Sequence, residues 1–163
     1  MKKYELTSET KIVFGHILYR IKALSSFGYV SAGDLGGFLE SEKNLSQNGN
    51  AWVYGNAWVS DNAEVYGNAE VSGNARVYGN AEVSKIGSIF WIGAVGSRND
   101  TATFFRCTDG VVRVTCGCFF GNLDEFAKKV RKTHGDNDHA KVYMLAIDMA
   151  KIRISTEKEK TEE

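Results

Sequence analysis

Three arginines between residues 98 and 113 have the chemistry to bind an anion. Arg106 and Arg113 flank the dipeptide Asp109-Gly110, which is typical of a two-residue β-hairpin loop. Such a loop predicts Arg106 directly opposite Arg113, and Arg98 can approach the same face. Like charges at this spacing destabilise a sheet, whereas guanidinium groups bind phosphate or carboxylate in a bidentate manner. The arginines therefore predict an anion site, and removal of Arg113 is expected to preserve or raise stability. The alternative is a solvated face with acidic residues nearby.

Two histidines flank the segment HGDNDH, which separates two expected helices. His134 and His139 are candidates for the rim of a polar ligand pocket, because a helix N-terminus beside them attracts anions. The alternative is that the segment supplies only capping and turn structure.

The same histidines follow two cysteines in a C-x-C…H-x4-H pattern, and zinc accepts both types of ligand. Cys116 and Cys118 would share one face of a strand. In the register given above, that face also holds Val112, Val114 and Phe105. An apolar face of this kind is typical of buried, unreactive thiols. The sequence therefore predicts no bound metal and no cofactor.

The segment that precedes these residues repeats every six residues between positions 51 and 84. Alanine and valine recur two positions apart, so both point to the same side of a short strand. The alanines are Ala51, Ala57, Ala63, Ala69, Ala75 and Ala81, and the valines are Val53, Val59, Val65, Val71, Val77 and Val83. Asparagine preceded by Gly or Asp supplies a corner in most repeats. Tyrosine and serine alternate after valine, so an 18-residue coil stacks each tyrosine on a serine. This pattern favours a parallel β-helix.

The hexad resembles the hexapeptide repeat of left-handed β-helix proteins over about residues 35–84, with Val in the aliphatic position and Ala in the small one. In that superfamily many members are acyltransferases and most are trimers. Their catalytic histidine lies on a projecting loop, whereas the hexads here are uninterrupted and His16 precedes them. The stretch GHILYRIKAL resembles β-helix proteins of bacteriophage and prophage genomes, which implies a phage accessory protein.

The predicted fold class is therefore mainly β, with a short left-handed parallel β-helix at residues 35–84. Residues 1–34 are expected to form a hairpin that caps the solenoid, and residues 85–154 a small α+β domain of order β-β-β-α-α. Residues 155–163 are polar and predict a disordered tail. Upstream of the hexads, Leu39 and Leu45 are expected in register with Ala51.

Both helices of the C-terminal domain are marked in the sequence. Asn122 is the expected N-cap of the first helix, and Gly135 its end. On the second helix an apolar stripe is expected to face the core, made of Val142, Leu145, Ala146, Met149 and Ile152.

Outward-facing aromatic residues predict a contact between subunits. Trp52 and Trp58 precede inward-facing valines, so they point outward and need cover from a neighbouring subunit or from the cap. On the second helix, Tyr143, Met144 and Ile147 widen the apolar surface. These five residues are the predicted interface of a homotrimer.

The 163-residue chain has a formal net charge of zero, so non-specific binding to nucleic acid or to an anionic membrane is not favoured. It has no apparent signal peptide or membrane span, and its three cysteines show no disulfide framework, so a cytoplasmic location is expected.

The predicted function is non-enzymatic binding of a small anionic ligand, for example a cyclic nucleotide or an ADP-ribose derivative, to antagonise host defence. A host defence protein is the alternative partner. Two other functions stay open: acyl transfer with coenzyme A, and a structural or protein-interaction role in the virion.

Overall fold

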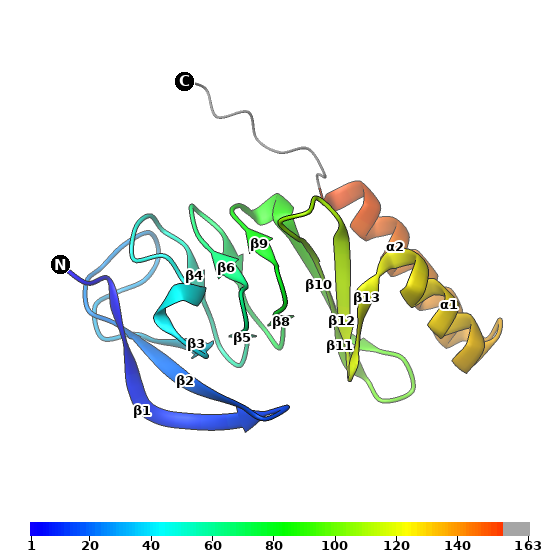
Figure 1. The fold of residues 1–163 in the computed structure, drawn as a ribbon, viewed down its shortest axis with the longest axis horizontal. Helices are drawn as coiled ribbons and strands as arrows, with labels where there is room; N and C mark the ends of the chain where they lie inside the picture. Colours follow the sequence, from blue (N-terminus) through cyan, green and yellow to red (C-terminus); the bar gives the residue numbers. More distant parts are fainter. Residues whose placement is uncertain (155–163) are drawn as a thin grey trace, which may run out of the picture. The chain divides into compact units, whose positions relative to one another are not determined.

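The structure, a computed structural model, describes residues 1–154 of the chain; the predicted disordered tail at 155–163 lies outside them. Contacts divide the chain into two compact units, the first from Met1 to Ile86 and the second beginning at Gly87. Figure 1 shows the strands of the first unit in blue to green and the helices of the second in yellow to red. Among the described helices, none combines the length and the hydropathy needed to cross a bilayer.

The hexads form six strands of two residues each, joined by tight corners. They are β4 (Trp52–Val53), β5 (Trp58–Val59), β6 (Glu64–Val65), β7 (Glu70–Val71), β8 (Arg76–Val77) and β9 (Glu82–Val83). Val53 pairs in parallel with Val71, Val59 with Val77, and Val65 with Val83. The 18-residue offset is therefore confirmed. Every alanine and valine at the two repeating positions of the hexads is at most 1% exposed.

The strands preceding the hexads form one mixed sheet with two of them. The antiparallel hairpin of β1 (Tyr4–Val13) and β2 (His16–Ala23) is followed by β3 (Leu35–Leu39). The sheet has the order β1-β2-β3-β5-β8. A short 3-10 helix at Glu42–Asn44 follows β3. Within it, the buried amide of Asn44 donates to the carbonyl oxygens of Asp61 (3.1 Å) and Ala63 (2.9 Å).

The second unit begins with a 3-10 helix at Ile86–Ser88 and an antiparallel sheet. Its strands are β10 (Ile89–Val95), β11 (Asp100–Arg106), β12 (Val112–Cys116) and β13 (Phe119–Asn122), paired in sequence order. Two helices cover one face of this sheet, α1 (Leu123–His134) and α2 (Asp138–Arg153) (Figure 1). As predicted, Asn122 caps α1 through a capping box with Glu125, and Gly135 ends it.

The predicted fold class, a left-handed parallel β-helix with a hairpin cap and a β-β-β-α-α domain, is wrong. Residues 1–154 contain thirteen strands in mixed, antiparallel and two-stranded parallel sheets. The hairpin is not a separate cap, because β2 bonds to the edge of β3, with Tyr19 opposite Leu39. The second unit has a fourth strand, β13, which precedes the helices.

The register of the segment upstream of the hexads also differs from the prediction. Leu39 pairs with Val59, and Leu45 forms an isolated bridge to Val65. The two leucines therefore occupy the valine position of the repeat, not the alanine position that Ala51 occupies. A larger side chain can take the valine position, whereas the alanine position offers less room.

Candidate functional site

The predicted pair of opposed arginines does not exist, because the loop between β11 and β12 is one residue longer than expected. The Cys107 N–H donates to the Val111 carbonyl (3.0 Å), and the Gly110 N–H, at φ +80°, donates to the Cys107 carbonyl (2.9 Å). Three residues therefore form the loop, with glycine in the left-handed position. Arg106 pairs with Val112, and Phe105 with Arg113.

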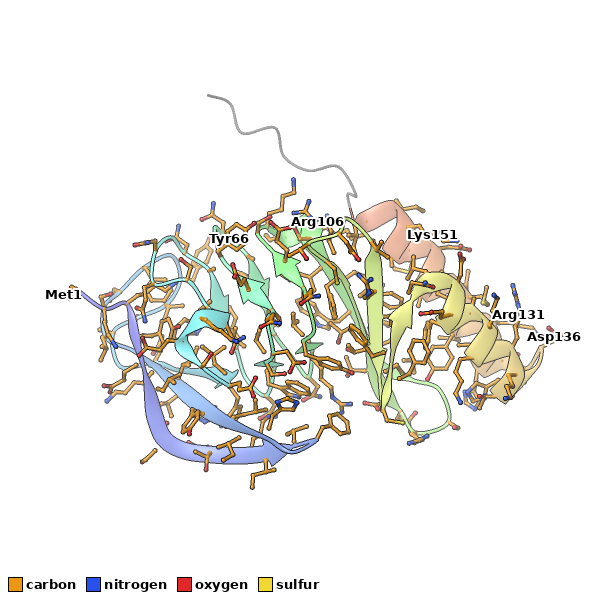
Figure 2. The ribbon with its side chains drawn as sticks, viewed as in Figure 1. Met1, Tyr66, Arg106, Arg131, Asp136 and Lys151 are labelled. Carbon is orange, nitrogen blue, oxygen red and sulfur yellow. The ribbon has the colours of Figure 1, made fainter. Side chains whose placement is uncertain are left out.

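This shift of one residue places the two arginines on opposite faces of the sheet. Arg113 binds its own hairpin loop: its two terminal nitrogens donate to the two oxygens of Asp109 at 2.8 and 2.7 Å. The Arg113 fork holds the pKa of Asp109 down at about 2. Arg106 shares its face with Val112 and is 4% exposed. Figure 2 shows that Arg106 lies far from Asp136, in the turn between α1 and α2.

A cavity in the second unit brings together two of the five predicted ligand-binding residues, Arg98 and His134. Its volume is about 140 Å³. The lining comes from the β10–β11 loop, the β12–β13 turn, α1 and α2: Ser97, Arg98, Asp100, Cys116, Gly117, Cys118, Phe119, Phe126, Lys129, Val130, Thr133, His134 and Tyr143. We call this cavity, with its lining residues, the C-terminal pocket. Arg106, Arg113 and His139 are not among the residues that line it.

Charge in the C-terminal pocket comes from different elements. Arg98 belongs to the β10–β11 loop and Lys129 to α1, and Asp100 supplies a carboxylate at the start of β11. Across the described part of the chain, neither the Arg98 guanidinium nor the Lys129 ammonium forms an ion pair or a side-chain hydrogen bond. The pocket therefore presents two cations that protein carboxylates do not bind directly.

The Tyr143 ring forms one wall of the C-terminal pocket. It stacks on His134 with centroids 5.8 Å apart, and His134 lies 5.5 Å from the ring of His139. The Tyr143 hydroxyl and the Cys116 thiol are 3.7 Å apart. Burial, followed by the contact with Cys116, raises the pKa of Tyr143. The predicted pair of histidines is thus adjacent, but only His134 reaches the cavity.

Within residues 1–154, none of the C-x-C…H-x4-H residues belongs to a group of three side chains that could hold a metal ion. Cys116 ends β12 and is partly buried, while Cys118 lies in the following turn and is exposed. The expectation that both thiols belong to the core is therefore wrong for Cys118. Phe105 likewise lies on the face opposite Val112, as a consequence of the loop.

In residues 1–154, one group of three side chains could hold a metal ion: His16, Glu40 and Asp61. His16 Nδ1 lies 2.8 Å from Glu40 Oε1, and Nε2 lies 3.7 Å from Asp61 Oδ1. The hydrogen bond with Glu40 raises the pKa of His16 and lowers that of Glu40. The other Glu40 oxygen accepts from the Asp61 N–H at 2.7 Å. Because these three groups already bind one another, we interpret them as contacts that join β2 to the first corners of the hexads. We call them the His16 cluster.

Four of the five residues predicted at a subunit interface are buried inside their own chain: Trp52, Trp58, Tyr143 and Ile147. The Trp52 ring lies 6.1 Å from Tyr4 and 5.3 Å from Phe27, between centroids. Trp58 stacks on Tyr78 at 5.4 Å. Met144 is partly buried against the helical core. Of the two expected sources of cover for the tryptophans, a neighbouring subunit or the N-terminal segment, the structure therefore shows the N-terminal strands and loop.

Sequence reasoning missed Lys129 and Lys3. Lys129 shares one face of α1 with Phe126, Val130 and Thr133, at spacings of three, four and seven residues from Phe126, which could have pointed to it. Lys3 is 5% exposed and donates to the Ala51 carbonyl at 2.9 Å. Burial lowers its pKa to about 8.

No protein-family model matches this chain, and no curated protein matches it either.

Proposed function

We propose that this protein is a binding protein whose C-terminal pocket takes the phosphate or carboxylate group of a small molecule. One observation carries this proposal: Arg98 and Lys129, from a loop and a helix, line the same cavity without an ion pair in residues 1–154. An anion between them would form charge-assisted hydrogen bonds, which are the stronger class.

The rest of the lining restricts the ligand. Phe119, Phe126 and Tyr143 offer aromatic surface, and Asp100 accepts hydrogen bonds and repels a second negative charge. The cavity volume of about 140 Å³ is below the roughly 300–1,000 Å³ of pockets that enclose whole drug-sized ligands. The pocket would therefore enclose one anionic group and a small attached part, while the rest of a nucleotide would extend outside.

The narrower proposal is that a phage-encoded protein sequesters a nucleotide signal of host defence in the host cytoplasm. Its support is the resemblance of the N-terminal segment to phage proteins, together with the charge of the pocket. Arg106 and Arg113 have no part in this form of the proposal, because Arg113 is bound to Asp109 and Arg106 lies outside the pocket.

Isothermal titration calorimetry tests this proposal with inorganic phosphate, ADP, ADP-ribose and a cyclic dinucleotide as probes. We expect Arg98→Ala and Lys129→Ala each to weaken binding of the best probe by about tenfold or more, which is about 1.4 kcal/mol. Lys132→Ala is the matched control, because Lys132 is exposed on α1 and does not line the cavity.

The proposal is wrong if no probe binds, or if the Arg98 and Lys129 variants bind as tightly as the control. A separate arm of the experiment incubates the protein with acetyl-coenzyme A and an amine acceptor, and the release of free thiol measures acyl transfer. Turnover there would favour the acyltransferase alternative over a binding protein.

A further inference from the structure

Helix α2 carries apolar side chains on two separate faces. One face packs on the sheet and on α1 through Ala140, Tyr143, Ala146, Ile147 and Ala150. The other face is exposed: Val142 is 40% exposed, Leu145 63%, Met149 49% and Ile152 88%. We call these four residues the α2 stripe.

The sequence prediction for α2 is therefore largely reversed. The stripe expected in the core is mostly exposed, and two of the three residues expected at an interface, Tyr143 and Ile147, are buried. Small side chains explain the choice of face, because Ala140, Ala146 and Ala150 let the helix approach its neighbours closely. The α2 stripe is left as a row of large apolar groups without cover in the described part of the chain.

The spacing of the α2 stripe is that of a coiled-coil seam. Its members are three, four and three residues apart, which matches positions a, d, a and d of two heptads. At about 100° per residue they lie within about 80° of the helix circumference. A narrow apolar seam of this kind fits a second helix better than it fits a flat surface.

The charges beside the seam are complementary to those of a second copy of the same helix. Lys141 and Asp148 occupy the g positions, and Ala146 and Arg153 the e positions. Lys141 already binds Asp138 of its own helix at 3.3 Å. In a parallel pair, a residue at g faces the e position of the following heptad in the other helix. Asp148 of one copy would then face Arg153 of the other, in both directions.

We propose that the α2 stripe is a self-association surface that seats the same stripe of a second copy, with the two α2 helices parallel about a two-fold axis. In the first heptad, Val142 at a with Leu145 at d favours two helices over three in parallel coiled coils. Four side chains form less than a standard interface of roughly 800 Å² per partner, so association should be weak, with a dissociation constant on the order of tens to hundreds of micromolar. The α2 stripe is separate from the C-terminal pocket, and the two proposals stand or fall independently.

The first test is the mass of the full-length protein by sedimentation velocity from about 1 μM to 1 mM. We expect wild type to change from monomer to dimer, and Leu145→Glu to shift the midpoint upward by at least tenfold. Thr108→Glu introduces the same charge at an exposed position in the β11–β12 loop and should behave as wild type. A monomer at every concentration, a trimer, or an unaffected Leu145 variant would overturn the proposal.

The second test distinguishes the parallel arrangement from an antiparallel one. At low salt, Asp148→Arg and Arg153→Asp should each weaken self-association by about threefold to tenfold, because each homodimer then contains two like-charge contacts. An equimolar mixture of the two variants should recover the wild-type midpoint, because both cross-pairs become attractive. In an antiparallel pair Asp148 would face Lys141, so failure of the mixture to recover would overturn the parallel geometry.

Discussion

In the N-terminal unit His16 lies between the carboxylates of Glu40 and Asp61, whereas in the C-terminal unit Arg98 and Lys129 line an open cavity. The first group contacts other protein charges and holds β2 to the hexads. The second group faces a space into which a ligand can enter. Charged residues alone therefore do not mark a binding site; the two groups differ in whether other side chains of the protein already bind them.

The hydrophobic cores of the two units also differ, since one is repetitive and the other is irregular. The core of the N-terminal unit repeats buried alanine and valine at two positions of each hexad, and the corners share a similar left-handed backbone, with φ between 56° and 68° from Gly55 to Gly79. The C-terminal unit has an irregular core of aromatic and aliphatic side chains around Phe126 and Tyr143, with a cavity at its edge. The irregular packing leaves the C-terminal pocket at the edge of this core.

The largest effect on the free energy of unfolding is expected when a charged side chain replaces a buried alanine of the hexads. Ala63 is 0% exposed, so Ala63→Glu would bury a carboxylate and should cost on the order of 5 kcal/mol or more. Asn62→Glu is the control, because Asn62 is exposed and lies beside Lys43. We expect hydrogen exchange to show lost protection in residues 1–86 and retained protection in α1 and α2. Simultaneous loss in both units would contradict the independence of the two cores.

A smaller effect is expected at the edge of the C-terminal pocket. Gly96 has φ +72°, and a Cβ there would overlap the Tyr143 hydroxyl. Gly96→Ala should cost about 2–4 kcal/mol, from backbone strain and from overpacking. Gly15→Ala is the matched control: its φ is +84° and a Cβ would meet nothing within 4 Å, so about 1 kcal/mol is expected. Equal losses in urea denaturation would mean that Tyr143 moves aside freely.

The fork between Arg113 and Asp109 should have a modest effect. Arg113→Ala removes both hydrogen bonds, and because the Asp109 side chain is 50% exposed, solvent screening limits the loss to about 0.5–1 kcal/mol at pH 7. The pKa of Asp109 is depressed to about 2. Its contribution is therefore present above its unfolded value near 4 and is lost as the pH falls through about 2. Urea denaturation of wild type and Arg113→Ala at pH 7 and pH 2 measures the difference in the free energy of unfolding, because urea, unlike guanidinium chloride, does not screen the ion pair. If Arg113→Ala is more stable than wild type, the repulsion between Arg106 and Arg113 that the sequence predicted would be supported instead.

Arg113 also shows where sequence reasoning ends. The hairpin at Asp109-Gly110 was predictable, but the choice between a two-residue and a three-residue loop was not, and one residue exchanges the faces of a whole strand. The register of the repeat was predictable, because Val53 must pair with another valine of the repeat, and it pairs with Val71. The edge partner of β3 and the strand β13 leave no periodic pattern, so the predicted fold class failed there.

The candidate site was partly predictable for a similar reason. Arg98 and His134 were identified by residue type, but Lys129 depends on which face of α1 meets the sheet. The two faces of α2 are both apolar in the sequence, so periodicity could not decide which one is buried. Three alanines on one face decided it through packing.

The smallest effect on the free energy of unfolding, a few tenths of a kcal/mol, is expected when the His16 cluster of the N-terminal unit is disrupted. Each of its side chains is about one third exposed, with values of 32% for His16, 31% for Glu40 and 37% for Asp61. Surface ion pairs of this kind contribute little. His16→Gln should therefore cost little overall, but it should change how stability depends on pH.

The direction follows from the two pKa shifts. The pKa of His16 is raised in the folded state, so its contribution is fully present below about 6.5 and is lost as the pH rises through the folded value. The pKa of Glu40 is lowered, so its contribution is present above about 4.3 and is lost as the pH falls through the folded value. The difference in the free energy of unfolding between wild type and His16→Gln should thus be largest near pH 5–6 and should decline as the pH rises above about 6.5, as measured by urea denaturation. Glu40→Gln should remove the same maximum, since either variant breaks the contact. A difference that does not decline as the pH rises would mean that His16 stabilises β2 by packing alone, and the contrast with the C-terminal pocket would then no longer depend on charge.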